Sequence, residues 1–390
     1  MLVAILLVVE CVMYSAVTPL LPHYAAAYGL SKTAAGVLAA SYSIGFLGGA
    51  PLGGWMAARA VRGTVIAGLV LFGAAALAFG LAGGVLLLDA IRTLQGIAGG
   101  IIWGGGLVWL VASTPRALRG AALGKVFAAS TAGTLMGPLL GTLALAASGG
   151  AVFGGVGGGA LLLGLYVGRL PAPPSVAPLA RVPLTFALRR PPLLVGAALF
   201  VLVACTLGTL GVLVPLRLAA GGSSGLGVGA TFVAAAALAA MTAPLAGAIV
   251  DGRGPLVPVR AGLIVMSASV LCLGFAHAPL IVAILTVLCV AGGAGACLGP
   301  CVAYVTATAE RMSVSFAAAT ATLNMAFAVG ESVGATAGPR VAQAAGDLPA
   351  LLSLGSALAV AAGALAAGIA HEGGRWLGLG DRQAAPANGD

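Results

Sequence analysis

Apolar runs of about 20 residues or more, each long enough to cross a bilayer as a helix, follow one another along almost the whole chain. Of its 390 residues, 61% are hydrophobic and 7% are charged, and the mean hydropathy is +1.13. Soluble domains carry about 25% charged residues. The alternating pattern of a membrane β-barrel is absent from the sequence. The sequence therefore predicts an all-α protein that crosses the membrane many times.

The apolar runs divide into twelve transmembrane helices in two pseudo-symmetric six-helix bundles. The N-terminal bundle covers residues 1–169, a Pro-rich basic linker covers 170–191, the C-terminal bundle covers 192–371, and a polar tail covers 372–390. The predicted spans are 2–22, 33–58, 62–84, 86–112, 120–148, 149–169, 192–218, 225–250, 256–277, 278–308, 313–345 and 347–371.

The basic residues predict the orientation in the membrane. With both chain ends on one side, most of the 18 Lys and Arg residues fall on that side, and only Lys32, Arg217 and Arg340 fall opposite. The positive-inside rule makes the richer side cytoplasmic. The first run begins at Met1 without a basic leader or a cleavage site, so we expect it to be a retained span. These signs predict a multi-pass protein of a bacterial plasma membrane with both termini in the cytoplasm.

The cysteines and the net charge of +9 indicate neither a metal nor a nucleic-acid site. All six cysteines lie in apolar runs, and although Cys297 and Cys301 are one helical turn apart, no His or further Cys completes a ligand set. The basic residues are spread over short loops rather than gathered in one patch. We expect no metal, no cofactor and no nucleic-acid partner, and a chain that is a monomer in the bilayer.

One apolar stretch, Leu86–Ala112, contains Arg92 at hydrocarbon depth. A charge there costs about 2.5–3.5 kcal/mol on insertion scales, so such residues face a protein interior or a wet cavity. Asp89, three residues earlier, predicts an ion pair with Arg92, and Gln95 extends the polar stripe. A purely structural pair that holds helices together is the alternative.

An offset of 193 residues aligns landmarks of the two halves and indicates an internal repeat. Residues 50–54, with sequence APLGG, meet residues 243–247, with sequence APLAG, and Pro22 meets Pro215. The same offset aligns residues 137–141 with residues 330–334 and places Glu331 at the position of Pro138. Parallel repeats of this kind hold their substrate near the midplane and rock one half against the other.

Three motifs then resemble the major facilitator superfamily, and within it the twelve-span drug:proton antiporters. RTLQGIAG from Arg92 resembles the R-x-x-Q-G motif of the fourth span, whose Arg the family implicates in proton coupling. GTLMGPLLG from Gly133 is similar to the antiporter motif G-x-x-x-G-P-x-x-G of exporters, with Gly133, Gly137, Pro138 and Gly141 in its fixed positions. Glu10 precedes the P-x-x-P of residues 19–22 by nine positions, as an acid does in these antiporters.

The resemblance also implies cytoplasmic gating loops, and here the chain departs from the family pattern. Gly54, Arg59 and Arg62 match G-x-x-x-D-R-x-G-R-R, but Ala58 replaces its Asp. The second copy keeps its Gly and Asp, at Gly247, Asp251 and Gly254. A latch between helices is implied, with its first carboxylate missing.

Asp347 begins the last predicted span at an outer turn, and only three of the nine acids fall inside the membrane: Glu10, Asp89 and Glu331. Burial disfavours the charged form of a carboxylate and a nearby Arg favours it, so a buried acid can switch with its surroundings. We expect Glu10 and Glu331 to line a central cavity with Tyr14 and Asn324, while Arg92 and Asp89 bias the protonation of Glu10. The alternatives are an acid that only binds Tyr14, for Glu10, and one that only pairs with Arg340, for Glu331.

Together these features predict a secondary transporter that exports small organic, amphipathic or cationic molecules in exchange for protons. A symporter or uniporter for a sugar, metabolite or lysolipid is the alternative within transport, and the Gly-Pro span argues against it. A membrane-embedded transferase would need an Asp-rich motif or a His/Asp dyad, and the sequence has neither. A sensor or scaffold that moves nothing remains a further alternative.

Overall fold

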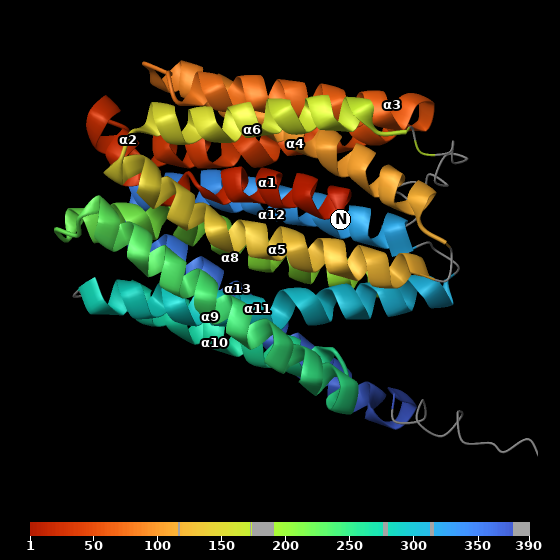
Figure 1. Cartoon of the computed structure of the whole chain (residues 1–390). Helices are drawn as coiled ribbons and strands as arrows, with labels where there is room; N and C mark the ends of the chain where they lie inside the picture. The colour runs from red at the N-terminus through yellow and green to blue at the C-terminus, as the bar shows by residue number, and fades with distance from the viewer. Residues whose placement is uncertain (116–117, 172, 174–190, 276–279, 313–315, 377–390) are drawn as a thin grey trace, which may run out of the picture.

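The computed structural model describes residues 1–115, 118–171, 173, 191–275, 280–312 and 316–376. Within these ranges the regular structure is entirely helical, and the helices run side by side (Figure 1). The predicted all-α class is confirmed. Residues 172 and 174–190 of the predicted linker 170–191, and residues 377–390 of the predicted tail 372–390, lie outside the described residues.

The helices fall into an N-terminal and a C-terminal set. The first comprises α1 (Leu2–Ser15), the 3-10 turn η1 (Thr18–Leu20), α2 (Leu21–Tyr28), α3 (Lys32–Phe79), α4 (Val85–Ser113), α5 (Arg119–Ala146) and α6 (Gly149–Arg169). The second comprises α8 (Pro191–Ala220), α9 (Gly225–Arg253), α10 (Leu256–Phe275), α11 (Leu280–Arg311), α12 (Phe316–Ala345) and α13 (Asp347–Trp376). We call the end of the molecule at which α6 ends and α8 begins the linker end, and the opposite end the far end.

Ten helical stretches in the described part of the chain are long and apolar enough to cross a membrane. One of them, α3, has 48 residues, more than twice the length that a bilayer requires. Its backbone leaves the helical conformation at Ala60, with φ −151° and ψ 83°. Two helices meet there: Gly53 before Ala60 and Gly68 after it both lie against Ile101 of α4, so the chain turns back on itself. The predicted spans 33–58 and 62–84 correspond to these two helices, and the second ends at Phe79. The count of twelve spans stays a prediction.

Local sequence signals explain several helix ends at the far end. Ser31, Ser148 and Ser224 cap the starts of α3, α6 and α9, each accepting a hydrogen bond from the backbone N–H three residues on. Gly29 ends α2 with a positive φ of 62°, a conformation that glycine adopts without penalty. These polar signals keep the turns short between long apolar helices.

The apolar side chains form two cores, one for each set of helices. One core is built almost entirely from α1 to α6 and the other from α8 to α13. In Figure 1 most of the N-terminal set, coloured red to yellow, lies above most of the C-terminal set, coloured green to blue, and α12 and α5 lie in the middle where the sets meet. Between the sets, α3 packs against α12 and α5 packs against α9. These two helix pairs are the seams between the halves.

Both seams are closed at the far end. On one side the Lys32 ammonium lies 2.5 Å from the Asp347 carboxylate, and the Thr33 N–H donates to Gln343 Oε1 at 2.9 Å. On the other side Gly229 of α9 lies against the Thr142 side chain of α5, where an added Cβ would collide with it. The two halves are therefore in direct contact along both seams at this end.

Candidate functional site

Arg92 is buried in the N-terminal half, with 1% of its surface exposed. Its guanidinium donates to the carbonyl oxygens of Met13 at 3.2 Å and Tyr14 at 3.0 Å. Both carbonyls belong to the last turn of α1, which ends at Ser15 shortly before Pro19. The last carbonyls of a helix lack partners within the helix, and a cation there also complements the helix dipole. Arg92 therefore caps α1 from the neighbouring helix α4.

The side-chain partner of Arg92 differs from the one that the sequence predicts. In the described part of the chain no ion pair joins Asp89 to Arg92, and Asp89 Oδ1 is buried without a hydrogen-bond partner. The prediction of that pair is wrong, because the Arg92 side chain reaches away from Asp89 toward α1. Gln95 serves instead: Arg92 donates to its Oε1 at 3.0 Å, and Gln95 Nε2 donates to the Ala75 carbonyl at 3.4 Å.

Glu10 lies on α1 with 3% of its surface exposed. The Tyr42 hydroxyl of α3 donates to Glu10 Oε1, Trp103 Nε1 of α4 donates to Oε2 at 2.8 Å, and the Cys11 thiol donates to Oε2 at 3.1 Å. Three donors around one carboxylate can hold a negative charge without a cation in direct contact. The structure gives Glu10 these partners rather than the Tyr14 hydroxyl.

Tyr42 connects Glu10 to Arg92. While its hydroxyl binds Glu10, the Arg92 guanidinium carbon lies 4.7 Å from the centroid of its ring. Tyr14 packs on the same ring, with centroids 5.3 Å apart. An aromatic ring attracts a cation placed over its face. The side chain of Tyr42 therefore contacts both charged groups, the Glu10 carboxylate through its hydroxyl and the Arg92 guanidinium through its ring.

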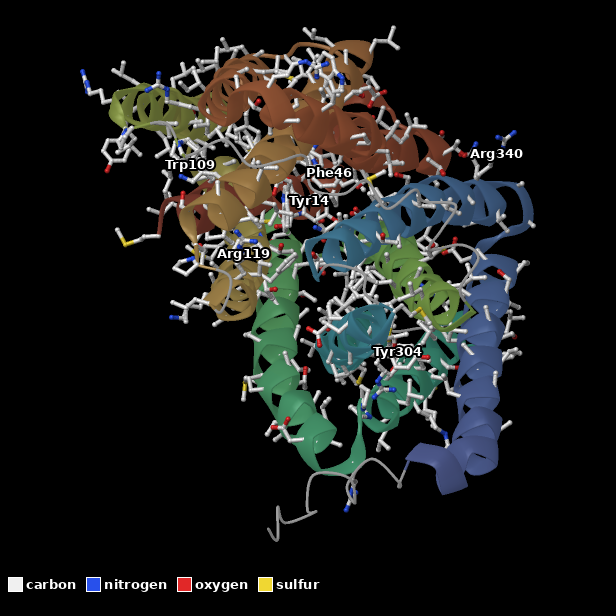
Figure 2. All side chains as sticks on the ribbon, turned by 90° about the vertical axis from the view of Figure 1, so that its right-hand side faces the viewer. Tyr14, Phe46, Trp109, Arg119, Tyr304 and Arg340 are labelled. Carbon is white, nitrogen blue, oxygen red and sulfur yellow. The ribbon has the colours of Figure 1, made fainter. Side chains whose placement is uncertain are left out.

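Glu331 approaches this group from the C-terminal half, on α12. Its carboxylate accepts a hydrogen bond from Ser43 of α3, the residue that follows Tyr42, and lies beside the Tyr14 hydroxyl of α1. Asn324 lies two helical turns earlier on α12 and is partly buried. Viewed from the linker end, Tyr14 lies near the middle of the molecule, between the two halves, whereas Arg340 lies at the edge (Figure 2). The structure thus brings Glu10, Tyr14, Arg92, Gln95 and Glu331 together and separates Glu331 from Arg340.

The glycines of the antiporter-like motif lie in the contact between α5 and α1. A Cβ added to any of them would meet α1 backbone or the Ser15 side chain, so the two helices approach more closely than other residues permit. Pro138 lies inside α5. Ser15 adds a hydrogen bond from its hydroxyl to the Thr134 carbonyl at 2.7 Å. The helix that carries the motif is therefore packed against the helix that carries Glu10.

The same contact recurs between α12 and α8, and it corrects the sequence alignment of the two halves. In the N-terminal half the glycine contacts are Gly133–Val8, Gly137–Val12 and Gly141–Ala16. In the C-terminal half the matching contacts, in the same order, are Gly330–Val201, Gly334–Cys205 and Gly338–Thr209. The repeat offset is therefore 193 for α8 but one helical turn longer, 197, for α12. Glu331 corresponds to Thr134 and not, as the constant offset predicts, to Pro138.

The gating-loop residues lie near the linker end, where two of the arginines bind locally. Arg59 stacks on Trp55, with its guanidinium carbon 3.8 Å from the ring centroid, and Arg62 donates to the Leu170 carbonyl at 3.0 Å. The second copy ends α9, where Asp251 is exposed and Gly254 has a φ of 80°. Gly54 and Gly247 have nothing within 4 Å of an added Cβ.

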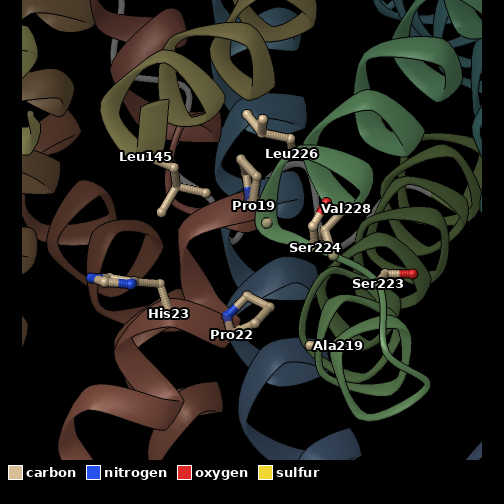
Figure 3. Close-up of a pocket in the computed structure, with 10 residues that line it drawn as sticks. Pro19, Pro22, His23, Leu145, Ala219, Ser223, Ser224, Leu226 and Val228 are labelled. Carbon is tan, nitrogen blue, oxygen red and sulfur yellow. The ribbon is translucent and has the colours of Figure 1, made fainter. Parts of the chain in front are cut away.

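A cavity of about 380 Å³ lies at the far end between the halves (Figure 3). It is separate from the Glu10 and Glu331 group. Its walls are Pro19, Pro22, His23 and Leu145 from the N-terminal half and Ala219, Ser223, Ser224, Gly225, Leu226 and Val228 from the C-terminal half. His23 thus lies at the outer end of the chain's first apolar stretch rather than among the buried acids.

Sequence reasoning missed the roles of two residues. It assigned no role to Tyr42 or Trp103, and both donate to Glu10. The polar run Ser41-Tyr42-Ser43 inside an apolar span was the available signal. Within the described residues no group of three or more His, Cys, Asp or Glu side chains could hold a metal ion.

Comparison with known proteins agrees with this architecture. The model of the Major Facilitator Superfamily matches residues 3–339. None of the curated proteins matches the chain.

Solved structures with the same fold are distant in sequence. A bacterial homologue of the human lysosomal transporter Spinster, inward-facing and unoccupied, is 17% identical, with 93% of this chain and 95% of that chain covered and a TM-score of 0.73. The nucleoside transporter NupG is 12% identical, with 94% and 98% covered and a TM-score of 0.69. The E. coli xylose transporter XylE, partially occluded and inward-open, is 17% identical, with 93% and 95% covered and a TM-score of 0.69. The chain therefore belongs to the Major Facilitator Superfamily, whose members are membrane transporters and not enzymes.

Proposed function

We propose that this chain exports small organic molecules, amphipathic or cationic, across a bacterial plasma membrane in exchange for protons. Twelve spans result if α3 counts as two, α1 to α2 as one, and α12 as a span. The halves are then residues 1–169 and 192–371, joined by the linker 170–191. The excess of basic residues places the linker end, both termini and the tail 372–390 in the cytoplasm. The transporter works as a monomer.

One observation carries the proposal: two acids, one from each half, meet at consecutive residues of α3. Tyr42 binds Glu10 and Ser43 binds Glu331. In an apolar interior the ionised form of a carboxylate is stable only when neighbouring donors or cations stabilise its charge. When the halves rock, Glu331 moves relative to Ser43, so its affinity for a proton changes with the direction in which the site opens.

Alternating access then proceeds from the closed far end. A cationic substrate enters from the linker end and replaces the proton on the acids, with the ring of the partly buried Tyr14 available to its apolar part. Rocking separates the far end and releases the substrate. A proton taken up there takes the place of the substrate on the acids, and it is released at the linker end once the far end has closed again.

The resemblance of the glycine–proline helix α5 to the motif of exporters supports export over import. Solved neighbours include a nucleoside and a xylose transporter, so uptake of a neutral solute is the competing function.

The direction of transport separates the two functions. Purified protein in vesicles is given a gradient that drives protons from the far end to the linker end, and tetraphenylphosphonium, a lipophilic cation, is the probe. We expect the cation to move against the protons and to stop when the gradient is collapsed. Movement of the probe with the protons, or movement that ignores the gradient, would refute proton-coupled export.

A further inference from the structure

The seam between α3 and the pair α12 and α13 (the α3–α12 seam) reaches from the far end to the buried acids. From the far end inward, its contacts are Lys32–Asp347, Thr33–Gln343, Gly36–Ala335 and Ser43–Glu331. The first three are an ion pair at the surface, a backbone hydrogen bond and a close approach of two helix backbones. Only the innermost contact has a titratable partner inside the apolar region. The seam therefore links closure at the surface to an acid in the interior.

The innermost contact depends on the charge of Glu331. Ser43 is 2% exposed, whereas Glu331 is partly exposed. A hydrogen bond to an ionised carboxylate is about twice as strong as one to a neutral acceptor. The titratable groups that face Glu331 are Tyr14 and Glu10 from α1 and Arg92 from α4, and all three belong to the N-terminal half. Losing the charge on Glu331 therefore weakens what holds α12 to the other half.

We propose that Ser43 is a positioning residue that couples closure of the far end to the ionisation of Glu331. The ionised carboxylate accepts the Ser43 hydrogen bond and holds the α3–α12 seam closed. When Glu331 takes up a proton from water, its neutral carboxyl group becomes a weaker acceptor for the Ser43 hydroxyl. The far end then opens more readily. Coupling is reciprocal, so closure of the far end in turn favours release of that proton.

The proposal rests on the proposed function only for the use of the proton, and its test needs no substrate. Full-length protein in lipid nanodiscs carries spin labels at Leu81, at the far end of the N-terminal half, and Ile281, at the far end of the C-terminal half, with Cys272 and Cys289 replaced by serine. We expect the ratio of closed to open distances to rise about fivefold to tenfold between about pH 5 and about pH 8, as the charged hydrogen bond forms. In Ser43→Ala this ratio is lower at the upper pH and nearly independent of pH.

Three further variants separate coupling from loss of structure. Ser41→Ala is the matched control, because Ser41 is also buried on α3 but donates to the Val37 carbonyl of its own helix. It keeps the wild-type response, and Ser43→Thr, which restores a hydroxyl, recovers it. Asp347→Asn lowers the closed fraction at every pH but keeps the pH response.

Two results would overturn the proposal: a full pH response in Ser43→Ala, or loss of that response in Asp347→Asn. A failure of proton-driven export leaves these distance measurements unchanged, so the two claims fail separately.

Discussion

The hydroxyl of Tyr42, on α3, donates a hydrogen bond to the buried carboxylate of Glu10, on α1. The Arg92 guanidinium lies over the ring of the same tyrosine. A single aromatic side chain thus sets the surroundings of both buried charges in the N-terminal half. The roles of Glu10 and Arg92 can therefore be changed without mutating either one.

Replacing Tyr42 by Phe keeps the ring beneath Arg92 and removes one donor from Glu10. Losing a hydrogen bond to a buried charged group costs about 1–3 kcal/mol. We expect proton-driven efflux to fall at least severalfold while the thermal unfolding temperature falls modestly. Tyr28→Phe is the matched control, because the Tyr28 hydroxyl bonds to the Ala82 carbonyl on an exposed surface. Equal efflux in both variants would show that the Tyr42 hydroxyl has no part in coupling.

Arg92→Lys is expected to lower stability as well as transport. The guanidinium reaches two carbonyls at the end of α1 and Gln95 at once, whereas an ammonium cannot reproduce that planar fork. Leaving such buried groups unpaired costs about 3 kcal/mol or more. Thermal unfolding in detergent measures the loss, with the exposed Arg340→Lys as the control. A melting temperature equal to that of the control would contradict the capping of α1 by Arg92.

Gly137→Ala tests the close packing of α5 on α1. An added methyl group would collide with the Ser15 side chain and the Val12 carbonyl, and overpacking of this kind costs about 1–3 kcal/mol. We expect lower thermal stability and reduced efflux. Gly155→Ala on α6, where an added Cβ meets nothing within 4 Å, leaves both unchanged. Wild-type behaviour of Gly137→Ala would mean that α1 and α5 separate without cost.

Much of the fold could be predicted from the sequence because the bilayer sets the length of each apolar helix. The range 149–169 predicted for one span is that of α6, and several others differ by a few residues at their ends. The tightness of the turn inside α3 could not be predicted, because the charged residues Arg59 and Arg62 suggest a loop, whereas only Ala60 leaves the helical conformation between the two helices. Hydropathy depends on composition alone and therefore does not predict how tightly the backbone turns between two spans.

The candidate site could be predicted as a set of residues but not as a set of contacts. Arg92, Glu10 and Glu331 are conspicuous because charges are rare in apolar spans. Helical spacing suggested Asp89 as the partner of Arg92, yet a long side chain can reach a neighbouring helix and does so here. The polar run 41–43 marks Ser43, but its partner could not be predicted, because the contact with Glu331 forms only when α12 packs against α3.

The proton movement that a substrate causes tests directly whether Glu10 and Glu331 couple transport to protons. Purified protein is reconstituted in vesicles that contain a pH-sensitive dye, and tetraphenylphosphonium is added at the linker end. We expect the wild type to move protons in the opposite direction to the cation. Glu10→Gln and Glu331→Gln lose this proton movement, and Glu310→Gln, whose carboxylate is exposed near the linker end of α11, keeps it. Undiminished proton movement in both Gln variants would contradict the assignment of proton coupling to these two acids.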